Sequence, residues 1–225
     1  MVTKEELNEI FERIGNDFGY RDVTAEYAPF RDMKIKWSRT YDWARFTVSD
    51  YLEEAPAEVI EDIVATLMKR MRGMETKGYL PETEEWLTSD EFLYLNRDRY
   101  IERSRSIDPE TENHVRLWES YRRLVDAGLV SGVRDLKLFW SKGDGVDKSG
   151  QSSCLMRTVI MNRRLMDPKV PMEVLDYCLL RQIANIAVPF GIMGPERRKE
   201  VIDLADTYPG ADAARRWLDQ VMMEV

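Results

Sequence analysis

The sequence predicts an α+β fold in which a small mixed β-sheet is packed by helices. Residues 33–48 alternate apolar and polar side chains around a short polar turn, which indicates two adjacent strands. Residues 56–71 and 171–187 instead carry apolar side chains three and four positions apart, the spacing of helices that bury one face. Among the 225 residues, 44% are hydrophobic, so the chain can bury a core of its own.

The N-terminal elements follow from short local signals. Residues 4–18 have helical periodicity, and Thr3 stands before them as an N-cap. Strands are expected near 33–38 and 43–48, and Pro56 opens the next helix because proline fits the first turn of a helix. Strand, turn, strand and long helix is a common beginning of a mixed α+β domain.

The rest of the chain is predicted to continue this domain. The charged stretch at about 80–130 is mostly helical and is interpreted as an insertion. No linker or internal repeat indicates a second domain, so residues 1–225 are assigned to a single domain whose last module spans about 136–225. The elements expected in that module are strands near 136–141 and 154–161, a glycine-rich hairpin loop between them, and helices at 171–187, 195–206 and 211–223.

Charge and composition exclude several classes of partner. The 33 Lys and Arg residues are outnumbered by 41 Asp and Glu, and the net charge of −8 repels phosphate backbones and anionic membranes. No stretch is long and apolar enough to cross a bilayer, and the N-terminal residues do not resemble a secretory leader. We therefore expect a cytoplasmic protein with no membrane partner, and nucleic acid is disfavoured. Cys154 and Cys178 are expected to be reduced core thiols.

The most informative segment is Arg181-Gln182-Ile183-Ala184-Asn185, on the predicted helix at 171–187. The phrases Asn162-Arg163-Arg164-Leu165 and Val170-Pro171-Met172-Glu173-Val174-Leu175-Asp176-Tyr177 precede it. Together with the hairpin before them, this order resembles the SprT-like, WLM and small gluzincin-type families of zincin metallopeptidases. The resemblance is densest over residues 136–188, and it implies a zincin-like fold.

The zinc chemistry of those families is missing here. Their helix carries His-Glu-x-x-His, because two imidazoles four residues apart share a helix face and bind one Zn²⁺ while the glutamate polarises its water. Arg181, Gln182 and Asn185 stand at those three positions, and none of them can replace the group it displaces. His114, the only histidine of the chain, lies in the charged stretch and is read as a surface residue. We expect no zinc, no other cofactor and no peptidase activity.

Two acidic residues follow the degenerate motif. Glu196 and Glu200 are four residues apart, and the resemblance suggests them as possible partners of Arg181 in the former pocket. The alternative is an exposed helix face, because they alternate with Arg197, Arg198 and Lys199. If Arg181 were buried, a carboxylate would have to pair with it.

The sequence leaves three functional hypotheses open. The first is an inactive zincin-like protein that binds a peptide or protein, or regulates one, along an edge strand near Cys154–Met161. The second is a small-ligand-binding protein or non-peptidase enzyme that uses the remodelled pocket around Arg181, Gln182 and Asn185. The third is a structural subunit that docks through the insertion at about 80–130.

Overall fold

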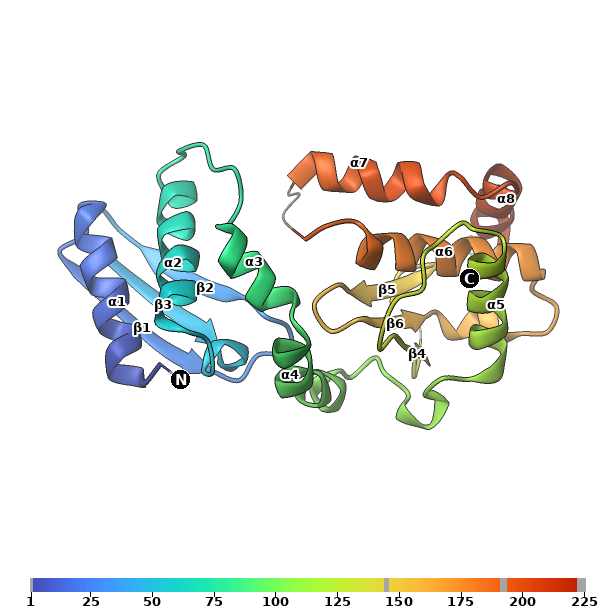
Figure 1. Ribbon diagram of the computed structural model, residues 1–225, viewed down its shortest axis with the longest axis horizontal. Coiled ribbons are helices and arrows are strands. Elements are labelled where there is room, and N and C mark those ends of the chain that lie inside the picture. Colours follow the sequence, from blue (N-terminus) through green and yellow to red (C-terminus); the bar gives the residue numbers. More distant parts are fainter. Residues whose placement is uncertain (1, 144–145, 191–193, 222–225) are drawn as a thin grey trace. The chain divides into compact units, whose positions relative to one another are not determined.

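The computed structural model of the chain describes residues 2–143, 146–190 and 194–221. These residues form two compact units, Met1–Arg103 (unit 1) and Ser104–Val225 (unit 2). The chain is a mixed α+β protein with one small three-stranded sheet in each unit, as Figure 1 shows. No helix in the described ranges is long and apolar enough to span a membrane.

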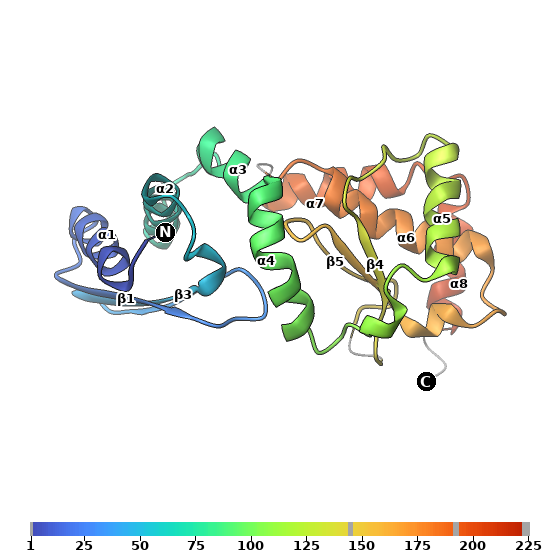
Figure 2. The ribbon, with the colours of Figure 1, turned by 60° about the horizontal axis from the view of Figure 1, so that its bottom comes forward.

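Unit 1 is a three-stranded sheet covered by helices. Its central strand pairs with a parallel neighbour on one side and an antiparallel neighbour on the other, in the order β1-β3-β2. Helices α1 and α2 lie together on one face of this sheet (Figures 1 and 2). The elements of unit 1 are α1 (Lys4–Asp17), β1 (Asp22–Ala28), β2 (Ile35–Arg39), β3 (Trp43–Ser49), η1 (Asp50–Leu52), α2 (Ala57–Met71), α3 (Pro81–Thr88) and α4 (Asp90–Arg103).

Local signals in unit 1 act as the sequence predicts. The Thr3 hydroxyl accepts a hydrogen bond from the backbone N–H of Glu6 at 3.2 Å, and the Glu6 carboxylate accepts one from the N–H of Thr3 at 2.8 Å. This reciprocal capping satisfies two N–H groups that a helix start otherwise leaves without partners. On the sheet, Phe46 of β3 packs against Phe11 of α1 with ring centroids 4.8 Å apart, inside the core.

Unit 2 is built around helix α6. The order of its sheet is β4-β6-β5, and all four residues of the central strand β6 are buried. Helix α6 packs on β5 and β6 and also contacts α5, α7 and α8 (Figure 1). The elements of unit 2 are η2 (Pro109–Thr111), α5 (Val115–Asp126), β4 (Lys137–Trp140), β5 (Gly150–Ser153), β6 (Thr158–Met161), η3 (Arg163–Met166), α6 (Met172–Ala187), α7 (Gly194–Ala205) and α8 (Ala211–Val221).

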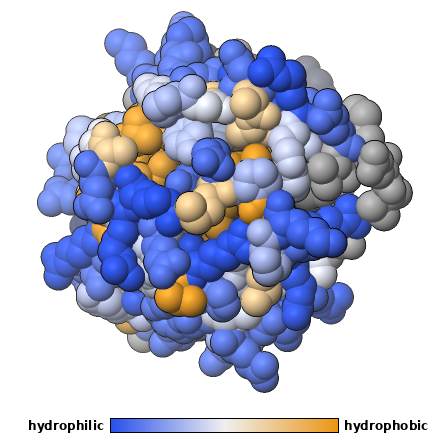
Figure 3. Space-filling model, turned by 90° about the vertical axis from the view of Figure 1, so that its right-hand side faces the viewer, coloured by the Kyte–Doolittle hydropathy of each residue, from blue (hydrophilic) through white to orange (hydrophobic). Residues whose placement is uncertain are grey.

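The core of unit 2 collects the apolar residues that the sequence predicts for α6. Val174, Leu175, Leu179 and Ile183 are all buried in one hydrophobic cluster with residues of β4 and β6. Burial of this apolar stripe of α6 supplies the main driving force for placing the helix against the sheet. At the surface, on the side shown in Figure 3, hydrophobic groups appear only as small patches between hydrophilic ones.

The two units share one topology. Each has a first helix, a strand, an antiparallel hairpin whose second strand is central, a short 3₁₀ helix and a second long helix. The second long helices begin with similar sequences, Pro56-Ala57-Glu58-Val59-Ile60-Glu61 and Pro171-Met172-Glu173-Val174-Leu175-Asp176. The sequence analysis saw no internal repeat, because this one lies in the order of the elements and few residue identities mark it.

The predicted organisation of the chain also needs correction. The strands expected near 33–38, 43–48, 136–141 and 154–161 do not share one sheet, because each hairpin pairs with a strand of its own unit. The stretch at 80–130 is not one insertion: α3 and α4 belong to unit 1, and α5 belongs to unit 2. In place of one domain spanning 1–225, the structure has two units, each with its own sheet.

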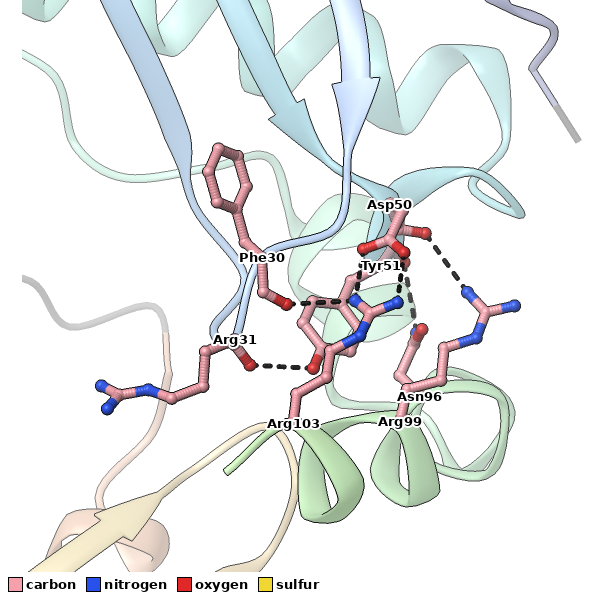
Figure 4. A network of polar contacts seen from close by, with 7 residues as sticks. All are labelled: Phe30, Arg31, Asp50, Tyr51, Asn96, Arg99 and Arg103. Atoms are coloured by element: carbon pink, nitrogen blue, oxygen red, sulfur yellow. Dashed lines mark hydrogen bonds and ion pairs between the residues drawn. The ribbon is translucent and has the colours of Figure 1, made fainter. Parts of the chain in front are cut away.

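A partly buried polar network holds α4 to the rest of unit 1 (Figure 4). Arg103 binds both carboxylate oxygens of Asp50 at 2.7 and 2.6 Å, and it donates to the backbone oxygen of Phe30 at 3.0 Å. The same guanidinium lies 5.5 Å from the ring centroid of Tyr51, whose hydroxyl donates to the Arg31 backbone oxygen. These contacts explain why α4 belongs to unit 1. They also give Arg103, one of several arginines of α4, a structural role.

In unit 2 the carboxylate of Asp176 has a similar role between helices. It lies in the first turns of α6 with only 6% of the residue exposed. Arg123 of α5 binds it with two nitrogens, at 2.9 and 2.7 Å, and the Ser120 hydroxyl donates to it at 2.5 Å. Each carboxylate oxygen therefore has a donor, and a planar two-pronged pair fixes the direction in which the two helices meet.

Replacement of Arg103 tests the network in unit 1. In Arg103→Ala, the Asp50 carboxylate stays mostly buried without its partner, and we expect the free energy of unfolding to fall by about 1–3 kcal/mol. The matched control is Arg21→Ala, which removes an exposed arginine of the same unit and should change stability by less than about 0.5 kcal/mol. Urea melts followed by circular dichroism measure both values. Equal midpoints for the two variants would show that the pair does not stabilise unit 1.

Candidate functional site

The segment Arg181-Gln182-Ile183-Ala184-Asn185 lies on the last turns of α6. The helix turns its residues by about 100° each, so these five positions face different surroundings. Ile183 and Ala184 point into the core, Gln182 is 8% exposed, Asn185 is partly exposed, and Arg181 is exposed. The two amides, and not the arginine, therefore face the neighbouring strand β5.

Strand β5 is one of the two edge strands of its sheet, and its first residue is a glycine. The central strand β6 separates β5 from β4, so the strand near Cys154–Met161 is not the edge that the sequence predicts. Gly150 has a φ of +127°, and a Cβ atom there would lie 2.4 Å from the backbone oxygen of Ile160. Because only glycine avoids that clash, the close approach of β5 to β6 depends on this residue.

A chain of side-chain hydrogen bonds joins α6 to β5. The Gln182 amide donates to the Ser149 hydroxyl at 3.0 Å, and the Ser152 hydroxyl donates to the Gln182 oxygen at 3.1 Å. Asn185 extends the chain by donating to the Ser152 hydroxyl at 3.1 Å. We call these four residues the amide–serine network. Ser152 lies on β5, Ser149 directly before it, and the two amides on α6, 30 or more residues away in sequence.

The network lies at an open hollow of about 500 Å³. Among the described residues, the side-chain oxygen of Asn185 accepts no hydrogen bond, and Asn185 lines the hollow. Arg181 adds a positive charge and a planar set of donors at the same hollow. The residues that line the hollow are Asp147, Lys148, Ser149, Gly150, Gln151, Ser152, Arg181, Gln182, Asn185 and Val201.

Among the residues that the structure describes, no carboxylate pairs with Arg181. Both Glu196 and Glu200 are exposed, and within the described residues neither forms an ion pair with Arg181. The pairing of Arg181 with Glu196 or Glu200 that the sequence suggests is therefore not present among these residues. An exposed guanidinium is hydrated, so it does not require the buried counter-charge that an arginine inside the pocket would need.

Arg197 of α7 contacts the end of α6. Its guanidinium donates to the backbone oxygens of Asn185 at 2.5 Å and Val188 at 2.9 Å, and also to that of Pro189. The last carbonyl groups of a helix have no partners within the helix, and a cation is favourable at that end. The sequence analysis did not find this role, because Arg197 lies 12 residues from Asn185 in the sequence and reaches it only through the packing of α7 on α6.

The two cysteines are free and are held as neutral thiols. Burial raises the pKa of the Cys178 thiol to about 12. Burial also raises the pKa of Cys154, although the nearby Arg197 opposes this shift, and the Cys154 thiol lies 3.8 Å from the Ile186 backbone oxygen. A protonated thiol is a poor nucleophile, so neither cysteine is suited to covalent catalysis near neutral pH.

His114 has a local structural role. Its Nδ1 accepts a hydrogen bond from the backbone N–H of Arg116 at 3.3 Å, at the start of α5, and its ring packs edge-on to Trp140 at 6.1 Å. In the part of the chain that the structure describes, no group of three or more His, Cys, Asp or Glu residues is arranged to hold a metal ion. The histidine is thus a helix cap.

A larger hollow of about 880 Å³ lies in unit 1 between α1 and the strands β1 and β3. Acidic side chains of α1, Glu5, Glu9 and Glu12, dominate its rim. These carboxylates lie on a solvated helix face, where charged residues are common and need no ligand. The hollow beside α6 is the stronger candidate, because buried polar side chains are ordered there by hydrogen bonds to one another.

Comparison of the chain with protein-family models, with curated proteins and with solved structures finds no match. The case for a function therefore depends on the geometry of the hollow beside α6 and on the chemistry of the side chains that line it.

Neighbouring positions of the motif should differ in their contribution to stability. Arg181→Ala removes an exposed side chain and should cost well under about 1 kcal/mol. Gln182→Leu keeps the shape of the side chain but leaves the buried Ser149 hydroxyl without its donor, and it should cost about 1–3 kcal/mol. Urea melts of both variants measure the difference. A larger loss for Arg181→Ala than for Gln182→Leu would contradict the assignment of the amide–serine network.

Stability should fall at alkaline pH. Burial raises the pKa values of Cys178, Tyr51 and Tyr100 to about 12 each in the folded chain. Unfolded cysteine and tyrosine ionise near pH 9–10, so above that range the unfolded chain releases protons that the folded chain keeps. The contribution of these groups is complete below about pH 9 and is lost as the pH approaches 12. Melting temperatures across this range test it.

The control for the pH series is Tyr41→Phe, because Tyr41 is 88% exposed and should leave the slope unchanged. Tyr100→Phe should make the slope shallower, since it removes one buried phenol. A melting temperature that stays constant from pH 9 to 12 would contradict the burial of these groups.

Proposed function

We propose that this chain is a catalytically inactive, zincin-like protein whose unit 2 binds an extended peptide segment of a partner protein. The observation that carries the proposal is the amide–serine network, which joins α6 to the edge strand β5 at an open hollow that Gln182 and Asn185 help to line. The positions that bear metal ligands and a general base in zincins bear hydrogen-bonding amides and an arginine here.

The side chains in the hollow are suited to recognition and not to catalysis. Gln182 and Asn185 can donate and accept hydrogen bonds, but an amide cannot take up a proton near neutral pH. Arg181 keeps its proton under the same conditions, so it can bind an anion but cannot act as a base. Ser152 lacks an adjacent base, because its hydroxyl is engaged by the two amides.

Strand addition is the binding mode that this geometry favours. In the described structure, no backbone hydrogen bond joins residues 151–153 on the outer edge of β5 to another segment. A peptide that pairs with this edge gains regular backbone hydrogen bonds, and alternate side chains then enter the hollow. The Asn185 oxygen would accept from a peptide N–H, and Arg181 would bind a carboxylate in two-pronged fashion.

A small molecule is the second candidate, and the size of the hollow favours it. A volume of about 500 Å³ is within the range of small-ligand sites. The lining would select a compound that carries an amide or a carboxylate. Docking through the 80–130 stretch receives less support, because that stretch is divided between the two units and presents no continuous element.

Selection of peptides from a displayed library, with the full chain as bait, tests the proposal. Dissociation constants for selected peptides are measured by fluorescence polarisation. Arg181→Ala and Asn185→Leu should each weaken binding by about five-fold or more, since each removes a polar group from the hollow. The matched control is Arg122→Ala, an exposed arginine on α5 that does not line the hollow.

Three results would count against peptide binding in the hollow. Selected peptides whose affinity is unchanged in both variants would place the site elsewhere. A thermal shift with amide-bearing or anionic small molecules, and none with peptides, would favour the second candidate. One tightly held zinc ion per chain, together with chelator-sensitive cleavage of casein, would overturn the assignment as an inactive protein.

A further inference from the structure

The edge strand β2 of unit 1 has an unusual charge for this chain. Over residues 33–41 the sequence is Met-Lys-Ile-Lys-Trp-Ser-Arg-Thr-Tyr, with three basic residues and no acidic one, in a chain whose net charge is −8. Lys34, Lys36 and Arg39 are all exposed. A local positive stretch on an acidic protein attracts acidic partners, even though the whole molecule does not.

The outer edge of β2 is open to pairing. The strand order β1-β3-β2 puts β2 at the edge of its sheet, and among the described residues no backbone hydrogen bond joins residues 35–39 to a segment beyond that edge. Such an edge presents backbone donors and acceptors in regular alternation, which is the template for an added strand.

A small apolar cavity lies directly beside this edge. It has a volume of about 160 Å³ between β2 and α2, and Ile35, Leu52, Ile63 and Leu67 supply its apolar walls. Two basic residues, Lys34 and Arg70, also line it. A cavity of this size fits one aliphatic side chain, with positive charge next to its opening.

An exposed aromatic residue continues the same face. Ile35, Trp37 and Arg39 pair across the ladder with Val48, Phe46 and Ala44, which are buried, so these three β2 residues lie on the helix-covered side of the sheet. Trp37 is nevertheless 47% exposed, and the Arg39 guanidinium lies 5.6 Å from its ring centroid. Exposed tryptophan beside arginine is typical of binding surfaces, where these two residue types contribute most of the affinity.

We propose that β2 of unit 1 is a docking edge for an extended acidic segment of another protein. The segment pairs with the outer edge of β2, places one aliphatic side chain in the cavity beside Ile35 and Leu67, and covers Trp37. Its carboxylates bind Lys34 and Lys36, which alternate with Ile35 and Trp37 at the start of β2. This surface lies in unit 1 and shares no residue with the hollow beside α6, so it is independent of the function proposed for unit 2.

Charge separates this occupant from a second copy of the chain. Pairing of two β2 strands would bring the lysines and arginine of one copy against the same residues of the other, and like charges across a strand pair are destabilising. Edge lysines often serve only to prevent such pairing. Prevention of self-pairing explains Lys34 and Lys36, but it explains neither the apolar cavity nor the exposed Trp37. A partner segment with acidic and apolar residues accounts for the lysines, the cavity and Trp37 together.

The test uses the full chain and a short fluorescein-labelled peptide that alternates Glu or Asp with Leu or Ile. We expect saturable binding in fluorescence polarisation that weakens as salt is raised, because exposed charges are screened. Lys34→Glu with Lys36→Glu should weaken binding about ten-fold or more, and Trp37→Ala should weaken it about five-fold. All of these positions are exposed or lie at an edge, and circular dichroism confirms that the variants fold.

The matched control is Lys142→Glu with Lys169→Glu, which makes the same change in net charge with two exposed lysines of unit 2. Binding should be unchanged in this control. Equal affinity for a peptide with lysine in place of each acidic residue would overturn the proposal. So would loss of binding in Asn185→Leu but not in the β2 variants, which would move the peptide to unit 2. Self-association in sedimentation that is lost in the β2 variants would identify a second copy as the occupant, against the proposal.

Discussion

The carboxylate of Asp176 sets the geometry on which unit 2 depends. It is almost fully buried, and a buried charge is tolerated only when donors surround it; Arg123 and Ser120 of α5 provide them. Because these donors come from one helix and the acceptor from another, the pair fixes how α6 lies against α5. The hydrogen bonds at the hollow depend on the position of α6, since Gln182 and Asn185 reach Ser152 of β5 only from that placement.

Unit 1 also contains a two-pronged arginine–carboxylate pair. The partly buried carboxylate of Asp50 lies just after the central strand, and Arg103 binds it from the last turn of α4. In unit 1 this pair ties α4 to the segment before α2, whereas in unit 2 it ties α5 to α6. By the aligned starts of the two long helices, Glu61 of α2 stands at the place of Asp176, and Glu61 pairs with Arg13 of α1. The helix-to-helix pair is therefore repeated in unit 1, where both side chains are more exposed.

The local elements were predictable because their signals are local. The Thr3 cap, the apolar stripes of α2 and α6, and the hairpin of β2 and β3 depend on residues a few positions apart. The division into two sheets was not predictable in this way, because strand pairing depends on contacts between distant segments. At the site, the sequence identified Gln182 and Asn185, but their partners Ser149 and Ser152 are set by the register of β5 against β6.

Gly150 and Arg181 represent two kinds of position in one hollow, and they differ in how freely they can evolve. A side chain at position 150 would collide with the Ile160 backbone, so the outline of the strand edge is fixed by the main chain. Arg181 is exposed and supports nothing beneath it, so many residues can replace it without harm to the fold. The scaffold can therefore stay constant while Arg181, the residue that we propose binds a carboxylate, changes. Under the proposed function, single substitutions at the rim of the hollow change the partner without a change in the fold.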